Sequence, residues 1–161
     1  MFLRGEKIIL CYVKPHDAHI LYQWENDRSI WNSSGTKKPL TKNEIKKFIS
    51  GQTDVYLDKQ LRLMIKNINN DALGCIDLFD FNERERKSAV GILIDKNHRK
   101  NGYASEALSL LSLYSFEILN LKKLHCTISS DNAASLNLFQ KNNFKIMKKK
   151  KNIFFLELLN C

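Results

Sequence analysis

The sequence lacks any hydrophobic run long enough to cross a membrane as a helix, which takes about 18 or more consecutive apolar residues. Its first seven residues already include Arg4 and Glu6 and no apolar stretch of the signal-peptide kind. We therefore expect no membrane partner and a cytoplasmic location. Only six Gly and two Pro occur in 161 residues, and no linker or repeat interrupts the chain. A single domain over residues 1–161 is the simplest organisation.

Metal-binding patterns are also missing. The four cysteines, Cys11, Cys75, Cys126 and Cys161, have no metal-type spacing, and the four histidines form no ligand set. Three of these cysteines lie in apolar, strand-like runs, where a thiol behaves as a small hydrophobic group. We expect no metal site, and a buried thiol is a better interpretation than a nucleophilic one.

Positive charge is in excess, with 26 Lys and Arg against 17 Asp and Glu and a net charge of +9. Such a balance suits nucleic acid or phosphate-rich ligands, but it also follows from a Lys-rich composition alone. The lysines are scattered except for four in a row at residues 148–151, which we interpret as a solvated hairpin tip. No nucleic-acid motif accompanies the charge, so we expect no nucleic-acid partner.

The order of helix and strand patterns predicts an α/β (α+β) fold. Strand-like runs cover residues 7–13, 61–65, 73–79, 89–94, 124–128, 144–147 and 153–159. Helical patterns cover residues 15–26, a segment opened by the capping box of Thr41 and Glu44, a long stripe from Ala104 to Ile118, and residues 132–142. The long helix joins strands 89–94 and 124–128, so these should be parallel neighbours in a mixed, mostly antiparallel sheet.

The turn after strand 89–94 carries the most informative pattern. It contains Arg99, Lys100 and Gly102 and leads directly into the long helix at Ala104. The first turn of a helix has amide groups without internal partners, and the peptide dipoles favour an anion there. Gly102 would let a ligand approach the backbone closely. This pattern by itself predicts a phosphate site, although an ordinary tight turn with surface lysines is equally consistent with it.

The spacing Arg99-x-x-Gly102-x-Ala104, after a strand and before a helix, resembles the acetyl-CoA signature of the GNAT acetyltransferase superfamily. A second segment, residues 131–144, is similar to the family's pattern of Asn, a small residue, Tyr, Lys and Gly-Phe, although Phe139 replaces the Tyr and Asn143 the Gly. The resemblance covers nearly the whole chain and is greatest to the branch with ribosomal-protein N-terminal and spermidine/diamine acetyltransferases. It implies a central sheet that is splayed between its two parallel strands, with helices on both faces.

The resemblance also implies roles for particular residues. The coenzyme would be acetyl-CoA, whose pantetheine arm would lie between the parallel strands and whose pyrophosphate would lie on the turn before the long helix. The residues implied in binding it are Ile92, Leu93, Ile94, Arg99, Lys100, Asn101, Gly102, Tyr103, Ala104, Ser105, Asn132, Ser135, Phe139 and Lys141.

The residues that accept and donate protons in the reaction are not settled by the sequence. A general base is expected because a lysine-like amine is almost wholly protonated at neutral pH. Asp77 and Asp80 are the candidates, but alternate residues of a strand point to opposite faces, so at most one should reach the site unless a bulge intervenes. Phe139 cannot donate a proton to the departing thiolate. Either the thiolate leaves unaided, or Tyr103 or a water donates the proton.

The acceptor pocket is predicted from Trp24, Glu25, Trp31 and Tyr56, although aromatic residues at helical spacing often belong to a core. The acceptor would be a primary amine on a small molecule, such as a polyamine or an amino sugar, or a protein N-terminus. The basic segment 33–38 argues against spermidine. A non-catalytic CoA-binding sensor or interaction module is the alternative. Dimers are common among relatives, so the resemblance allows a homodimer without identifying an interface.

Overall fold

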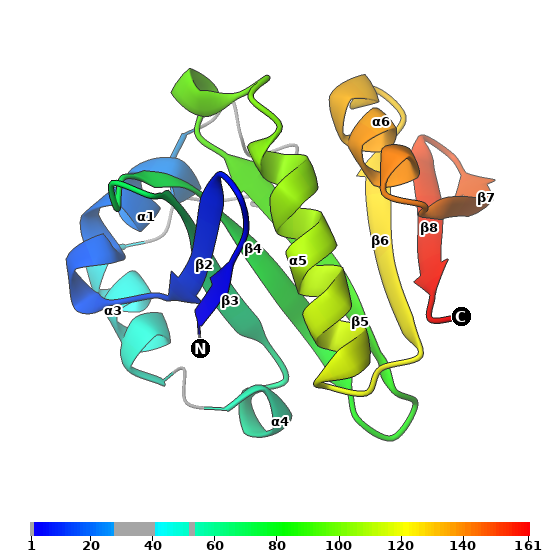
Figure 1. The fold of residues 1–161 in the computed structure, drawn as a ribbon, viewed down its shortest axis with the longest axis horizontal. Coiled ribbons are helices and arrows are strands. Elements are labelled where there is room, and N and C mark those ends of the chain that lie inside the picture. The colour runs from blue at the N-terminus through cyan, green and yellow to red at the C-terminus, as the bar shows by residue number, and fades with distance from the viewer. Residues whose placement is uncertain (1, 28–40, 52–53) are drawn as a thin grey trace.

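The structure is a computed structural model that describes residues 2–27, 41–51 and 54–161 (Figure 1). The strands of the described chain are β1 (Phe2–Arg4), β2 (Ile8–Tyr12), β3 (Leu61–Asn67), β4 (Ala72–Asn82), β5 (Lys87–Ile94), β6 (Lys123–Ser129), β7 (Lys145–Lys150) and β8 (Ile153–Leu159). The helices are α1 (Ala18–Glu25), α3 (Lys42–Gly51), α4 (Val55–Asp58), α5 (Tyr103–Glu117) and α6 (Ala133–Lys141), with short 3₁₀ turns η1 (Pro15–Asp17) and η2 (Lys96–His98).

Eight strands of the described residues form one central sheet, in the order β1-β2-β3-β4-β5-β6-β8-β7. All neighbouring strands are antiparallel except β5 and β6, which α5 connects as a crossover helix (Figure 1). The prediction of a mixed, mostly antiparallel α/β fold with one parallel pair is therefore confirmed.

Strand alternation distributes the core over two faces of the sheet. Leu63 and its neighbour Ile76 pack with Leu108 and Leu111 of α5, whereas Met64 and Cys75, one residue along each strand, pack with the helices α1 and α3. Because side chains alternate across a strand, these two clusters lie on opposite sides of the sheet. Helices therefore cover both faces, as the family resemblance implies.

The N-terminal helices follow local sequence signals. Pro15 begins η1, which leads into α1, and the Thr41 hydroxyl accepts a hydrogen bond from the amide of Glu44 at 3.1 Å, as a capping box requires. Asp17 has a larger role than a helix-start charge, because it is 3% exposed and pairs with buried Lys66 at 3.0 Å. Among the described residues, no helix is both long and apolar enough to cross a membrane.

Several features differ from the sequence prediction. Strand β1 and helix α4 were not predicted, since three- and four-residue elements carry too little periodicity to be recognised. Strand β4 runs on to Asn82 because a bulge at residues 79–82 lets the chain continue pairing with β5. Only Lys151 of the lysine run lies in the hairpin turn, and the other three form exposed positions of the edge strand β7. Lysines on an edge strand discourage pairing with a further strand.

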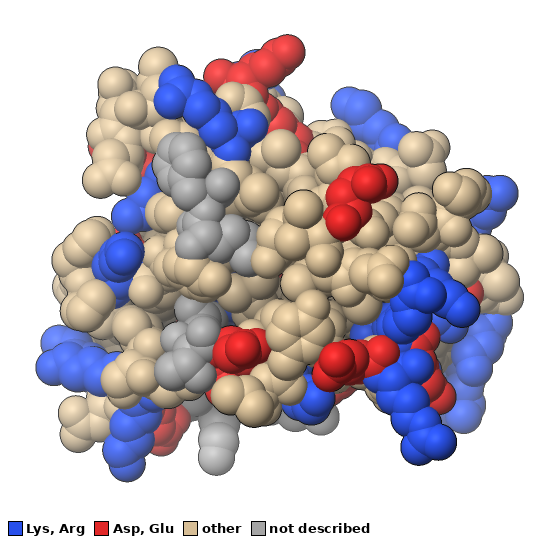
Figure 2. Space-filling model, turned by 60° about the horizontal axis from the view of Figure 1, so that its bottom comes forward, with Lys and Arg blue, Asp and Glu red and all other residues tan. Residues whose placement is uncertain are grey.

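Charges of both signs share the surface. On the face drawn in Figure 2, acidic side chains lie among the Lys and Arg side chains.

Candidate active site

The parallel strands β5 and β6 separate after three residue pairs. Their pairing runs from Lys87↔Lys123 to Ala89↔His125 and then stops within the described chain. Beyond that point, β5 remains paired with β4 and β6 with β8. A cavity of about 510 Å³ occupies the opening, between residues 90–93 of β5 and residues 126–129 of β6. Backbone groups on this edge of β5 have lost their strand partner and are open to a ligand.

The turn between β5 and α5 is held in shape by its own side chains. Asp95 accepts hydrogen bonds from the amide of Asn97 and from the indole of Trp24, each at 2.9 Å. Burial by itself would raise the pKa of Asp95, but these hydrogen bonds and nearby positive charges such as Lys96 together lower that pKa. Arg99 folds back onto the carbonyl of Ile94, and Asn101 donates to the carbonyls of His98 and Arg99.

The N-terminus of α5 is open. Gly102 has φ +80°, and a Cβ built there would meet only Lys7 Nζ, at 3.6 Å. No side chain caps the helix, and the first intrahelical hydrogen bond of the described residues runs from the amide of Glu106 to Gly102. The amides before it, at residues 103–105, are therefore available to an anion. The backbone here fits a diphosphate.

The β1–β2 hairpin braces this turn from the side. The Glu106 carboxylate, in the first turn of α5, accepts hydrogen bonds from the amides of Glu6 and Lys7. Lys7 Nζ in turn donates to the carbonyl of Asn101 at 3.3 Å. Lys7, from the N-terminal part of the sequence, thus adds a positive charge beside the turn that leads into α5.

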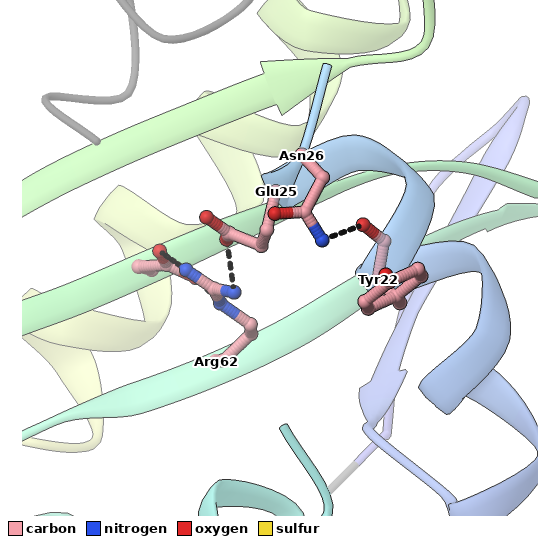
Figure 3. A network of polar contacts seen from close by, with 5 residues as sticks. Tyr22, Glu25, Asn26 and Arg62 are labelled. Carbon is pink, nitrogen blue, oxygen red and sulfur yellow. Dashed lines mark hydrogen bonds and ion pairs between the residues drawn. The ribbon is translucent and has the colours of Figure 1, made fainter. Parts of the chain in front are cut away.

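A charged network of Glu25, Arg62 and Asp77 also lines this cavity, and Figure 3 shows Arg62 and Glu25 in contact within it. Arg62 of β3 donates to both oxygens of Asp77 at 2.8 and 2.7 Å and to Glu25 of α1 at 2.8 Å. The side chains of Glu25, Arg62 and Asp77 are 10%, 21% and 22% exposed, and all three residues line the cavity. The two carboxylates bring negative charge next to the edge of β5, where an amine would bind.

A second cavity of about 290 Å³ adjoins the first. It shares Arg62, Asp77 and Phe79 with the larger cavity and is also lined by Phe48 of α3, whose ring lies 5.4 Å from the Arg62 guanidinium. The charged network therefore lies where the two cavities meet.

The structure brings together only part of the predicted catalytic and acceptor residues. Asp80 lies on the bulge with φ +48°, is exposed, and is not among the residues lining either cavity. Tyr56 packs edge-to-face on Phe81, 5.4 Å away, and lines neither cavity. Trp24 is 4% exposed and belongs to the core beneath Asp95. Trp31 lies outside the described residues.

Helix α6 forms the far wall of the cavity. Asn132 caps this helix by accepting from the amide of Ser135 at 3.1 Å, and both residues line the cavity. Phe139 also lines it, but this side chain is 3% exposed and packs edge-to-face on Phe144. Of the coenzyme residues predicted on β5, Ile92 and Leu93 line the cavity. Ile94, Lys141 and the residues of the turn, 99–105, lie outside it.

Two cysteines line the cavity as well, but neither is poised as a nucleophile. Burial raises the pKa of Cys75 to about 12 and that of Cys126 to about 12. At pH 7 roughly one thiol in 10⁵ would then be ionised, and the thiolate is the reactive form.

Sequence reasoning missed Arg62, Lys7 and Glu106. A signal existed for Arg62, since it is the one charge inside the predicted apolar run 61–65, and a buried charge needs partners. Lys7 and Glu106 carried no such signal, because they are 99 residues apart and meet only through the tertiary fold.

Known proteins that are similar in sequence to this chain include N-acetyltransferases. The chain is similar to spermidine N(1)-acetyltransferase of Escherichia coli K12, with 24% identity over 99 residues, covering 62% of this chain and 53% of that protein. It is also similar to the uncharacterized N-acetyltransferase YoaA of Bacillus subtilis, with 23% identity over 145 residues, 89% of this chain and 82% of that one.

Its fold is that of the Vibrio cholerae spermidine N-acetyltransferase solved in complex with CoA and spermine, with a TM-score of 0.85, 18% identity and 96% coverage of both chains. The family model for the acetyltransferase (GNAT) domain matches residues 7–145. The strands β5 and β6 separate and the N-terminus of α5 is open, which fits this family. The chain belongs to the GNAT acetyltransferase family.

Proposed function

We propose that this protein transfers an acetyl group from acetyl-CoA to a primary amine, on a small molecule or a peptide N-terminus, by direct transfer in a ternary complex. The observation that carries this proposal is the opening between β5 and β6. It combines unpaired backbone groups of β5 on one side with the carboxylates of Glu25 and Asp77 on the other.

The residues present fit the coenzyme. The amides of residues 103–105 and the positive charges of Arg99, Lys100 and Lys7 would hold the diphosphate. The edge of β5 at residues 92–94, with Asn132 and Ser135 opposite, would hold the pantetheine arm. Acetyl-CoA would supply the activated thioester.

The edge of β5 also has a catalytic role in this proposal. An unpaired amide near Leu93 would donate to the thioester carbonyl and stabilise the negative charge that develops on its oxygen. Loss of such a donor typically costs about 3–4 kcal/mol of transition-state stabilisation.

Asp77 is the carboxylate that we propose to act on the amine, directly or through a water. Asp80, the other predicted candidate, is exposed on the bulge and lines neither cavity. Both oxygens of Asp77 accept from Arg62, and each oxygen keeps a second lone pair that an amine or a water can use. Arg62 thereby fixes the orientation of the carboxylate.

Direct transfer is favoured over an acyl-enzyme because the thiols in the cavity are poor nucleophiles. Cys75 and Cys126 have a pKa of about 12 each and stay protonated at neutral pH.

The acceptor is best sought among polyamines and other small primary amines. The similarity to spermidine acetyltransferases supports a polyamine, and so do the paired carboxylates Glu25 and Asp77. The basic residues of segment 33–38 argue for an acceptor with less charge, but they lie outside the described residues.

A second candidate function, a CoA-binding sensor with little turnover, is favoured by one observation. Phe139 is buried where many relatives carry a proton-donating Tyr, and Tyr103 is not among the described residues that line the cavity. In the enzyme proposed here, a water protonates the departing thiolate, or the thiolate leaves unaided.

The test is an amine panel that includes spermidine, amino sugars and short peptides, with CoA release as the readout. We expect turnover with at least one amine, a loss of about a hundredfold in Asp77→Asn, and unchanged turnover in the matched Asp80→Asn. Tight CoA binding without turnover on the whole panel would instead favour the sensor. An Asp80→Asn variant as inactive as Asp77→Asn would refute the assignment of Asp77.

A further inference from the structure

The end of α6 is linked to the first turn of α5 by one side chain. Asn142 follows the last residue of α6, and its Nδ2 donates to Ser105 Oγ at 3.1 Å. Its backbone amide donates to the carbonyls of Leu138 and Phe139, which fixes its place at the helix end. Ser105 is one of the residues whose amides face the diphosphate position, so this link joins α6 to the coenzyme turn.

The direction of this hydrogen bond is determined by a third group. Asn142 Nδ2 also donates to the carbonyl of Leu138 at 2.9 Å. A carbonyl can only accept, so the side-chain atom facing it must be the amide nitrogen and not the amide oxygen. Both hydrogens of Nδ2 are then used, one on Leu138 and one on Ser105. The Ser105 hydroxyl acts as acceptor in this pair, and its own hydrogen is directed elsewhere.

We propose that Asn142 is a positioning residue for the coenzyme. By donating to Ser105 Oγ, it directs the Ser105 hydroxyl hydrogen toward the diphosphate on this turn. The inference rests on the proposed function, since it assumes that acetyl-CoA binds at the N-terminus of α5. Hydrogen bonds to a charged oxygen are among the stronger ones, so the direction of one hydroxyl has a measurable effect on affinity.

Replacing Asn142 by Asp reverses the bond without changing the shape of the side chain. A carboxylate can only accept, so the Ser105 hydroxyl would turn back to donate to it and would be lost to the diphosphate. The Leu138 carbonyl keeps its hydrogen bond from the backbone amide at 3.2 Å, which limits the damage to the helix end. Asn142→Ala, which removes the donor without adding charge, is the second variant should Asn142→Asp fold poorly.

The experiment measures CoA affinity by calorimetry and catalytic efficiency with two acyl donors. Acetyl-CoA carries the diphosphate, whereas S-acetylpantetheine carries the thioester alone. We expect Asn142→Asp to weaken CoA binding by about tenfold or more, Asn142→Ala to weaken it less, and neither to change kcat/KM for S-acetylpantetheine. Asn137→Asp, which adds the same charge at an exposed position of α6, should leave CoA binding unchanged.

The double variant separates positioning from a structural role. In a Ser105→Ala background, Asn142→Asp should have little further effect, because the hydroxyl that it redirects is gone. An equal loss with S-acetylpantetheine, or a full loss in the Ser105→Ala background, would overturn the proposal. Unchanged CoA binding in Asn142→Asp would overturn it while leaving the proposed function intact, whereas a wild-type protein that does not bind CoA would refute both.

Discussion

The two ends of the β5–β6 pair differ in how the two strands are joined. At the closed end, three residue pairs are joined, and the Arg86 side chain donates to the backbone and side chain of Asn120 at 2.7 and 2.6 Å. At the open end, β5 stays with β4 and β6 stays with β8, and a cavity replaces the pairing. The closed end therefore holds the strands together, and the open end leaves peptide groups for a ligand.

The neighbouring strands keep the open end in place. Gly74 of β4 approaches β5 so closely that a Cβ there would come within 2.1 Å of the Leu93 carbonyl oxygen. Gly74 pairs with Ile94 and Cys75 with Leu93, so β5 stays joined to β4 where it no longer pairs with β6. An unpaired strand edge can thus be kept in a fixed position for catalysis as long as the other edge is fully paired.

The largest expected effect is at the N-terminus of α5, next to the open end of the β5–β6 pair. Gly102→Asp places a carboxylate beside the diphosphate position and a side chain at φ +80°. Like-charge repulsion at close range and the strained backbone should lower CoA affinity roughly a thousandfold. Calorimetry measures it, with Gly51→Asp as the control, since a Cβ at Gly51 meets nothing within 4 Å. Equal CoA affinity in a folded Gly102→Asp variant would place the coenzyme elsewhere.

The next effect concerns the charges at the open end. Arg62→Ala removes the guanidinium that pairs with Glu25 and Asp77, and taking a cationic partner away from largely buried carboxylates is destabilising. We expect the free energy of unfolding to fall by about 3 kcal/mol. Urea unfolding measures it, with exposed Arg84→Ala as the matched control, which should change stability by less than about 0.5 kcal/mol. If Arg62→Ala proved as stable as Arg84→Ala, the network would contribute nothing to the fold.

A smaller effect tests whether water is excluded from the Cys126 thiol at the open end. The pKa of Cys126 is raised to about 12 in the folded protein by burial, above the ordinary thiol value. Above pH 9 the unfolded state loses this proton and the folded state keeps it, so the thiol's contribution to stability is complete below pH 9 and is lost between about pH 9 and 12. Between pH 10 and 11 the wild type should therefore lose about 1.3 kcal/mol of unfolding free energy to this thiol, and Cys126→Ala should not show that loss.

Exposed Thr127→Ala, next to Cys126 on β6, is the control for that measurement and should leave the slope with pH unchanged, because it removes no titrating group. A slope in Cys126→Ala identical to that of the wild type would mean that water reaches the thiol in the open end.

The smallest effect tests whether the two ends are independent. Arg86→Ala removes the exposed side-chain hydrogen bonds to Asn120 at the closed end. Surface interactions of this kind contribute about 1 kcal/mol or less, and CoA affinity should stay within about twofold. Thermal unfolding and calorimetry give the two values. A tenfold loss of CoA affinity would show that pairing at the closed end controls the opening.

Much of this molecule was predictable from local patterns. The strand and helix runs and the crossover between residues 94 and 124 were predicted correctly, because hydrophobic period and turn chemistry act over a few residues. The phosphate site at the Gly102 turn stays a prediction. Short elements such as β1 and α4 were not predicted, and the bulge that carries Asp80 out of the cavity lining leaves no clear trace in the sequence. The candidates Asp77 and Asp80 could not be separated before the bulge was seen.

The sequence by itself determined the family and the parallel pair of strands on either side of the crossover helix, since each depends on the spacing of neighbouring residues. Only the tertiary structure decided which side chains share the site. Arg62 joins Glu25 and Asp77, Lys7 and Glu106 join the β1–β2 hairpin to the start of α5, and Asn142 reaches Ser105. These contacts link residues 15 to 99 positions apart, and such pairings arise from packing three-dimensional elements rather than from any period along the chain.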